Sequence, residues 1–416
     1  MVKLYRVMMF LIVTIMVVGC AAPNVIHKDY TNQQITISTG GLIDEQQFYR
    51  NYGNFILDHF PGIEINVSNT DNSNTEDSNK VPIDLVVLPW NQFAQLRNDD
   101  YLQDVTSYVM RDRFDLTQFS DSMVTAMKDG DEGLYGLASR ANVDGIFYNK
   151  DMFAAMQVDD LPNEMTWKEL LHIAAQFTGE PFGIESLSLS PEELLLNMAS
   201  LLFDSAGTAV ELPEQQWMEA LEQVVMAHQL GAVTAGMGEL FIEEKAAMYR
   251  GMLVNANRFA TEASFNYGFV PEPVDPANRD VSQSLYFDLV LAIPKESTQQ
   301  ELAWEIIKTL MSEDVAEQYN IQARNINSGA HISTLKSKMY DYADLSLVPF
   351  WEKQIVLSEA RYPASISDSF IGELYTILQE QLQLAIEGQL TTEQCYMAIK
   401  EKVTVAFDKE KLREFN

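Results

Sequence analysis

The sequence predicts an α/β protein with room for two domains. The chain has 416 residues, which is enough for two domains of ordinary size. Short apolar stretches typical of strands alternate with segments of helical periodicity. One stretch, residues 82–90 (PIDLVVLPW), contains a continuous apolar run, which is typical of strands buried on both faces of a parallel sheet.

The first elements follow one another closely. Residues 34–41 (QITISTGG) predict a strand that runs into a glycine pair, and the apolar spacing of residues 48–60 predicts a helix that ends at Pro61. A second strand is expected at 63–69, a polar loop at 69–80 and the third strand at 82–90. This order indicates an α/β lobe with right-handed crossovers.

Helices dominate the later part of the chain. Thr166 and Glu169 form a capping-box pattern, and Ser190 followed by Pro191 is a second helix start. A strand is expected between these helices and the C-terminal ones. The remaining expected elements are a helix at 213–230, a strand at 284–294, an amphipathic helix at 301–319, and helices at 367–387 and 392–407.

The N-terminus has the pattern of a secretory signal peptide over residues 1–19. Lys3 and Arg6 precede an apolar run at 7–18, which is shorter than the roughly 20 residues a spanning helix needs. Val17-Val18-Gly19-Cys20 resembles the bacterial lipobox, in which the cysteine is lipidated and begins the mature chain. We therefore expect export, a lipid on Cys20 and a linker at 20–34. A plain signal cleaved near Ala22 and a spanning anchor are the alternatives.

The charge excludes one class of partner. The formal net charge is −32, and it is −34 without residues 1–19, which carry Lys3, Arg6 and no acid. Nucleic acid is not an expected partner, because phosphate binding needs a basic surface. An acidic protein is also repelled by anionic lipid, so the lipid anchor is expected to hold it at the membrane. The second cysteine, Cys395, shares helical spacing with Ile399 and is expected to be a buried structural thiol.

The usual signals of an enzyme are missing. The chain has no G-x-S-x-G, H-E-x-x-H, P-loop or paired C-x-x-C pattern, and no two of its five histidines have ligand spacing. We expect no catalytic residue, no metal and no cofactor. A glycosidase, which needs two carboxylates across one cleft, is the enzymatic alternative that sequence leaves open.

Four segments carry a resemblance to a known family. They are Tyr135-Gly136-Leu137 leading through Asn142 to Phe147–Asp151, then 166–170 (TWKEL), 245–248 (KAAM) and 303–308 (AWEIIK). In this order they resemble the extracellular solute-binding proteins of ABC importers, the group that includes the maltose-binding protein. The resemblance covers nearly the whole mature chain. It implies a two-lobed, type II periplasmic-binding-protein-like fold, with lobe 1 at 35–141 plus 284–327, lobe 2 at 142–283 plus 328–416, and the ligand between them.

Candidate ligand-binding residues come from two arguments. Ligands of open α/β sheets lie beyond the carboxyl ends of strands, which selects Thr39, Gly40, Gly41, Trp90, Asn142 and Asp144. The resemblance adds Tyr249, Arg250, Tyr286, Phe287 and Arg324. Each has a structural alternative: a core position for Trp90, a turn for the glycines, packing within the hinge for the two later aromatics, and a surface charge for Arg250.

The expected function is that of a lipoprotein on the outer face of the cytoplasmic membrane of a Gram-positive type of bacterium. It would act as a monomer that passes a small solute to ABC permease subunits, with a sugar or oligosaccharide favoured. Two departures weaken the sugar assignment: Val254 stands where many sugar-binding relatives have a stacking tryptophan, and residues 286–288 stand where a glycine pair is frequent. Arg250 would suit an anionic solute, and a peptide solute or a sensory role are further alternatives.

Overall fold

The structure is a computed structural model of the whole chain. It describes residues 30–41, 43–68, 82–129, 133–177, 179–199, 201–203, 209–279, 281–282, 284–287, 289–323, 332–342, 345–351, 354–355 and 366–414. The expected signal peptide, the Cys20 lipidation site and Arg324 lie outside these residues.

Lobe 1 is built on a five-stranded sheet with the order β2-β1-β3-β16-β6. The strands are β1 (Gln34–Ser38), β2 (Glu64–Ser68), β3 (Leu85–Leu88), β6 (Gly136–Leu137) and β16 (Val290–Ala292). β1 is parallel to β2 and β3, whereas β16 is antiparallel to β3 and β6. The parallel core of this sheet therefore presents the carboxyl ends of β1 and β3 at one edge.

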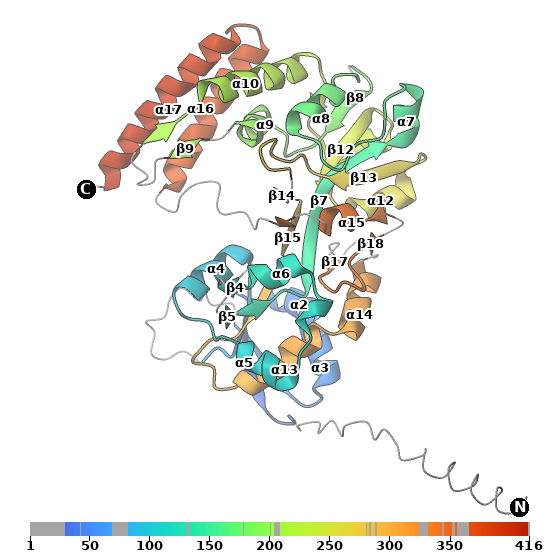
Figure 1. Ribbon diagram of the computed structural model, residues 1–416, viewed down its shortest axis with the longest axis vertical. Helices are drawn as coiled ribbons and strands as arrows, with labels where there is room; N and C mark the ends of the chain where they lie inside the picture. Colours follow the sequence, from blue (N-terminus) through green and yellow to red (C-terminus); the bar gives the residue numbers. More distant parts are fainter. Residues whose placement is uncertain are drawn as a thin grey trace, which may run out of the picture.

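Helices surround this sheet (Figure 1). After β1 come α2 (Glu45–Phe48), a π-helical turn (Tyr49–Gly53) and α3 (Asn54–His59). The other lobe 1 elements are α4 (Trp90–Asn98), α5 (Thr106–Asp112), a 3-10 turn (Leu116–Gln118), α6 (Asp121–Ala126), the β4 (Lys128–Asp129) and β5 (Gly133–Leu134) hairpin, α13 (Gln300–Leu310) and α14 (Glu313–Ala323).

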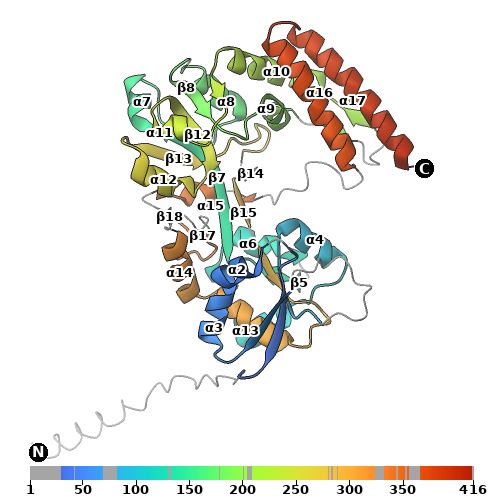
Figure 2. The same ribbon diagram turned by 180° about the vertical axis from the view of Figure 1, so that it is seen from behind.

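The ten-residue strand β7 (Arg140–Asn149) runs from lobe 1 into lobe 2 (Figures 1 and 2). At its start it pairs antiparallel with β15 (Leu285–Phe287) and β17 (Ile332–Ser333). Farther along it pairs antiparallel with β12 (Ala246–Met252) and β13 (Tyr267–Pro271). One strand is thus shared by the crossing and by the lobe 2 sheet.

Lobe 2 is built around the order β11-β8-β12-β7-β13, with β8 (Phe182–Glu185) and β11 (Val233–Thr234). Helices α16 and α17 lie side by side at its far edge (Figures 1 and 2). The lobe 2 helices are α7 (Lys150–Ala155), α8 (Trp167–Ala174), α9 (Pro191–Met198), α10 (Glu214–Gln229), α11 (Glu239–Ile242), α12 (Asn255–Glu262), α15 (Val348–Trp351), α16 (Asp368–Ile386) and α17 (Thr392–Glu414). Short pairs complete the chain: β9 (Leu202–Phe203) with β10 (Val210–Glu211), β14 (Val281–Ser282) with β20 (Gln354–Ile355), and β18 (Asp341–Tyr342) with β19 (Leu345–Ser346).

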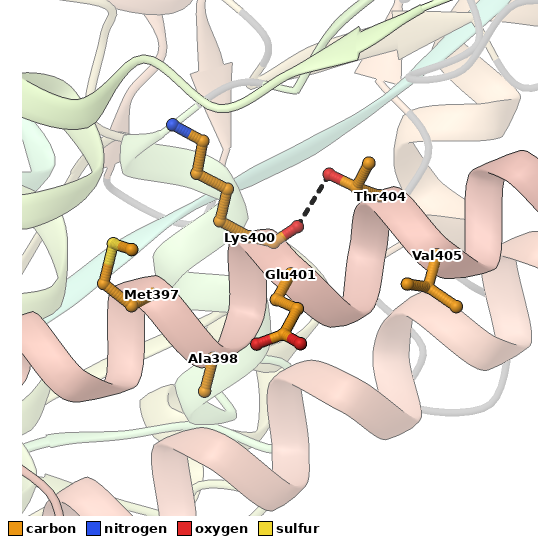
Figure 3. Close-up of a pocket in the computed structure, with 6 residues that line it drawn as sticks. All are labelled: Met397, Ala398, Lys400, Glu401, Thr404 and Val405. Carbon is orange, nitrogen blue, oxygen red and sulfur yellow. Dashed lines mark hydrogen bonds between the residues drawn. The ribbon is translucent and has the colours of Figure 1, made fainter.

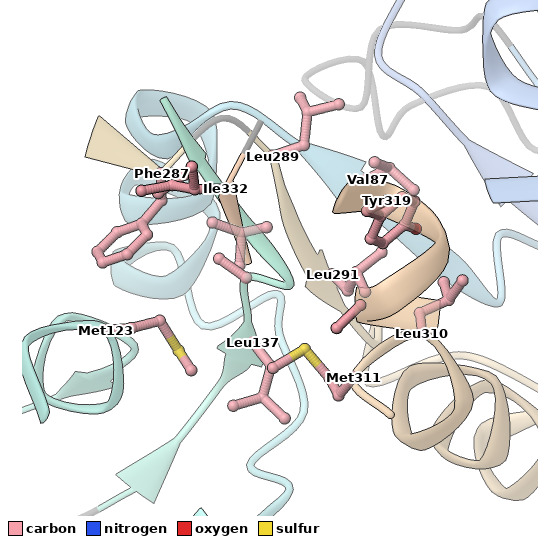
Figure 4. Packing of buried hydrophobic residues seen from close by; sticks show 14 of the residues in the cluster. Val87, Met123, Leu137, Phe287, Leu289, Leu291, Leu310, Met311, Tyr319 and Ile332 are labelled. Carbon is pink, nitrogen blue, oxygen red and sulfur yellow. The ribbon is translucent and has the colours of Figure 1, made fainter. Parts of the chain in front are cut away.

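Two hydrophobic cores hold these layers. The first fills lobe 1 and continues past the crossing, where Phe287 and Ile332 join Val87 and Leu291 (Figure 4), to one face of the lobe 2 sheet at Phe147. The second lies on the opposite face of that sheet, beneath α8 to α10, α16 and α17. The lobe 2 sheet is therefore buried on both sides, as its apolar strands predict.

Most of the predicted elements are confirmed. Thr166 and Glu169 form a capping box, with reciprocal hydrogen bonds between side chain and backbone, and the Ser190 hydroxyl accepts the N–H of Glu193. The α/β fold class is confirmed, whereas the exact lobe boundaries stay a prediction. Cys395 is fully buried and its thiol donates to the Gln381 carbonyl oxygen at 3.4 Å, and burial raises the pKa of that thiol to about 11.

Two expected elements are divided. The strand expected at 284–294 is two strands, β15 and β16, because its first half pairs with β7 and its second half enters the lobe 1 sheet. The helix expected at 301–319 is α13 and α14, because Ser312 begins a new helix by accepting the N–H of Val315 on its hydroxyl. The last helix is longer than expected and ends at Glu414.

A partly buried edge of lobe 1 depends on Asp112. Its carboxylate accepts hydrogen bonds from Trp304 Nε1 at 2.8 Å, Lys308 Nζ at 2.7 Å and Arg111 Nε at 2.7 Å. These donors, Arg111 first, hold the pKa of Asp112 well below its usual range, against the effect of burial. The ionised carboxylate therefore ties α5 to α13.

Replacing Asp112 with Asn should lower the free energy of unfolding at pH 7 by about 1–2 kcal/mol, because the amide cannot accept charge-assisted bonds from three donors. Since the pKa is depressed in the folded state, the stabilisation is present above the unfolded pKa of roughly 4 and is lost as the pH falls further. Urea unfolding at several pH values from 7 to 3 measures this effect: the difference in the free energy of unfolding between the wild type and Asp112→Asn should become smaller as the pH falls. Asp121→Asn, at an exposed ion pair, is the matched control and should change stability by less than about 0.5 kcal/mol; an equal loss in both variants would contradict the assignment.

Candidate functional site

One face of the sheet at the crossing gathers polar side chains. Asn142 and Asp144 are two residues apart on β7 and so project to the same face. Tyr286 pairs with Asn142, and Met252 pairs with Asp144. We call the set of side chains on this side the crossing face, which comprises Asn142, Asp144, Arg250, Met252, Glu272 and Tyr286.

The crossing face continues the second hydrophobic core. Ile146, Met248 and Val270 occupy the same side of the sheet deeper in lobe 2 and are buried in that core. Toward the crossing the side chains on this side become polar or exposed, and Tyr286 and Met252 are 36% and 40% exposed. The apolar interior thus gives way to a polar surface between the two lobes.

A charged cluster forms the centre of the crossing face. Arg250 Nε lies 2.6 Å from Glu272 Oε1, and its guanidinium also donates to the Ser188 hydroxyl and lies 6.0 Å from the centre of the Trp167 ring. The Glu272 backbone N–H donates to the Ser284 hydroxyl at 2.7 Å, which fixes the residue beside β15. Arg250 is therefore held by groups from three separate segments.

Burial dominates the electrostatics of this cluster. It raises the pKa of Asp144, and Arg250 opposes that rise. It also raises the pKa of Glu272, and Arg250 opposes the rise while Asp144 adds to it. The two carboxylates therefore compete for one guanidinium.

The lobe 1 candidates lie at the carboxyl ends of neighbouring strands. Gly40 and Gly41 follow β1 with φ of 58° and 76°, a left-handed turn that glycine adopts without a side-chain clash. Thr39 is fully buried, and its hydroxyl donates to the Ile43 carbonyl oxygen at 3.1 Å. Trp90 follows β3, begins α4 and is half-buried against Phe93, with ring centres 5.5 Å apart. Because Leu88 pairs with Val290, this strand end lies next to the chain that leaves β15.

Two predicted residues lie on the opposite face of the sheet. The Tyr249 ring is buried and lies 6.2 Å from the Phe147 ring, in stacked orientation, and Phe287 is 2% exposed within the first core (Figure 4). Tyr286, one residue earlier on β15, belongs to the crossing face instead. The alternation of side chains along the strands therefore separates Tyr286 and Arg250 from Phe287 and Tyr249.

Sequence reasoning did not select Glu272, Met252 or Ser188. A signal for Glu272 was present in residues 267–274 (YGFVPEPV), where one acid directly follows the apolar residues of a buried strand. Ser188 gave no comparable signal, because only the tertiary fold brings the loop after β8 to the end of β12.

A surface hollow lies on helix α17, away from the crossing face. Its lining comes from one face of α17 (Figure 3), where the Thr404 hydroxyl donates to the Lys400 carbonyl oxygen at 2.8 Å. The residues that line it are Met397, Ala398, Lys400, Glu401, Thr404 and Val405. None of the predicted site residues belongs to it.

The described residues contain neither a metal-binding cluster nor a membrane-spanning helix. Within them, no group of three or more His, Cys, Asp or Glu side chains is arranged to hold a metal ion. None of the helices in the described part of the chain is long and apolar enough to cross a membrane.

Comparison with known proteins identifies the family. Residues 44–317 match the family of bacterial extracellular solute-binding proteins, and the chain belongs to that family. Members of this family are extracellular proteins that bind a solute. No curated protein sequence matches the chain.

Solved structures of low sequence identity share the fold. The ABC substrate-binding protein Lmo0181 of Listeria monocytogenes, in complex with cycloalternan, is 17% identical with a TM-score of 0.57, covering 91% of this chain and 98% of its own. A solute-binding protein of Agrobacterium vitis with bound D-mannitol is 19% identical with a TM-score of 0.57, covering 92% and 99%. A family 1 extracellular solute-binding protein of Alicyclobacillus acidocaldarius is 13% identical with a TM-score of 0.64, covering 91% and 98%.

The fold and the family together define an extracellular solute-binding protein with two lobes. The crossing face combines lobe 2 side chains with the crossing strand β15.

Proposed function

We propose that this protein is a membrane-tethered solute receptor that captures a sugar or an oligosaccharide and delivers it to an ABC permease. The crossing face carries the proposal, because exposed Tyr286 and the hydrogen-bonding groups of Asn142 and Asp144 lie together on one side of the sheet in a member of a solute-binding family. An aromatic ring beside polar groups suits a sugar, which has an apolar face and a hydroxylated rim. The complexes of the Listeria and Agrobacterium proteins with cycloalternan and D-mannitol support this class of ligand.

The proposed mechanism is a shift between open and closed arrangements of the lobes. Solute would bind the crossing face, bridge to Trp90 and to the turn at Gly40 and Gly41 in lobe 1, and so favour the closed state. Closure would be the change that the permease detects.

The ligand class is tested by thermal unfolding of residues 21–416 against mono- and oligosaccharides, polyols, amino acids, peptides and small anions. A ligand that binds only the folded protein raises the melting temperature, by an amount equivalent to about 2.7 kcal/mol at a hundredfold excess over Kd. We expect the shift in one saccharide class. A rise in melting temperature with peptides alone would reject the sugar assignment. An unchanged melting temperature with every ligand of the panel would favour a receptor that presents itself to a sensory partner.

Alanine at both Trp90 and Tyr286 should weaken binding of the saccharide found in that panel about 10- to 100-fold, because both rings are proposed to cover its apolar face. Isothermal calorimetry measures the affinity. Tyr108→Ala is the matched control: Tyr108 is a half-buried lobe 1 tyrosine packed on Trp304, so its loss should lower the melting temperature of the free protein but leave the affinity unchanged. Unchanged affinity in the double variant would place the ligand elsewhere.

The lipid anchor is tested in cells. Cys20→Ser should abolish incorporation of a labelled fatty acid and move the protein from the membrane fraction to the medium, because the proposed thioether site is lost. Cys395→Ser is the control and should keep both label and location, since the Cys395 thiol is buried. A Cys20→Ser protein that stays labelled and membrane-bound would reject the lipoprotein proposal.

A further inference from the structure

Arg250 is the single positively charged residue of the crossing face, and neighbouring side chains already bind its guanidinium. Arg250 forms the 2.6 Å ion pair with Glu272, donates to the Ser188 hydroxyl and faces the Trp167 ring. Its side chain is 17% exposed and that of Glu272 is 10% exposed, so this ion pair is largely removed from water. A buried ion pair of this kind is costly to separate, because either partner would be left as an uncompensated charge. Arg250 is therefore not a vacant receptor for an anion.

The unsatisfied groups beside this pair are hydrogen-bond acceptors. Asp144 Oδ1 and Asn142 Oδ1 are buried and accept no hydrogen bond from any of the described residues, and the Asn142 residue is only 6% exposed. Both lie on the same side of β7 as Arg250 and Glu272 on the flanking segments. A buried acceptor without a donor is destabilising, and a ligand that supplies a hydroxyl or an ammonium hydrogen would remove this penalty.

The net charge of the crossing face also disfavours an anionic ligand. Asp144, Glu272 and Arg250 carry a formal charge of −1 together when the two acids are ionised. A sulfate or a carboxylate brought to this face would meet the carboxylates of Asp144 and Glu272 and the unsatisfied amide oxygen of Asn142, and it has no hydrogen to donate. Such repulsive contacts are an effective way for a site to discriminate against a competing ligand.

We propose that Arg250 is the internal counter-ion of Glu272 and Asp144, and that the crossing face thereby selects neutral or cationic solutes that donate hydrogen bonds and rejects anions. This inference rests on the proposed solute-binding role of the crossing face. It assigns Arg250 a positioning role, holding the acceptors in place, rather than a contact with the solute. It also decides against the anionic solute that Arg250 suggested in the sequence.

The test is a gain of anion binding, with inorganic sulfate as the probe. In Asp144→Asn/Glu272→Gln the two competing carboxylates become neutral, so the Arg250 guanidinium becomes available. We expect no saturable sulfate binding to residues 21–416 of the wild type by equilibrium dialysis at pH 7, and at least a tenfold higher affinity in the double variant. Glu219→Gln/Glu222→Gln, which makes the same change of net charge on the exposed side of α10, should show no gain.

Two further variants separate a positioning role from a general effect on structure. Adding Arg250→Gln to the double variant should abolish the gain, whereas adding Arg250→Lys should keep part of it, because lysine retains the charge without the planar fork. If the double variant does not fold, Glu272→Gln alone replaces it, with the same expectation of gain. Saturable binding of sulfate to the wild type, lost in Arg250→Gln, would overturn the inference, as would a folded variant without any gain.

The outcomes also distinguish this inference from the proposed function. If the double variant gains sulfate binding and no saccharide raises the melting temperature of the wild type, selection against anions is supported and the sugar assignment is rejected. A saccharide ligand for the wild type with no sulfate gain in the folded variant would keep the sugar and reject the role of Arg250.

Discussion

The structure depends on one strand, β7, which serves two environments within ten residues. Its first half pairs with β15 and β17 at the crossing, and its second half lies between β12 and β13 in lobe 2. At Gly145 the neighbouring strand comes so close that an added Cβ would lie 2.5 Å from the Val270 carbonyl oxygen. The close approach of β13 thus needs glycine at the centre of the crossing strand.

The two faces of β7 lie in different environments. Ala141, Val143 and Phe147 lie on the face that belongs to the first core, so lobe 1 and one side of the lobe 2 sheet share a continuous apolar interior. Asn142 and Asp144 lie on the other face, where the second core ends. A slip of one residue in the pairing would exchange these faces and bury the polar set, which the apolar core strongly disfavours. The register that stabilises the lobes therefore also places the candidate site where the second core ends.

The predictability of the elements follows the range of the interactions that make them. The Thr166 capping box and the Ser190 helix start were predicted correctly, because a cap is formed by residues three positions apart. The strand at 284–294 was predicted as one element, because its apolar residues are continuous and nothing local shows that its halves join different sheets. The site shows the same limit: sequence selected residues 286 and 287 together, and only pairing with β7 assigns Tyr286 to one side and Phe287 to the other.

The sequence by itself determined the α/β class, the order of the elements, the caps at Thr166 and Ser190 and the family, because these depend on periodicity, local hydrogen bonds and motifs in a fixed order. It also provided Asn142, Asp144, Arg250 and Tyr286 as candidates. Only the tertiary structure decided that these four share one side of the sheet and that Arg250 is bound by Glu272, 22 positions along the chain. The physical reason is that strand register and ion pairing between distant segments depend on which strands become neighbours, and no local pattern contains that information.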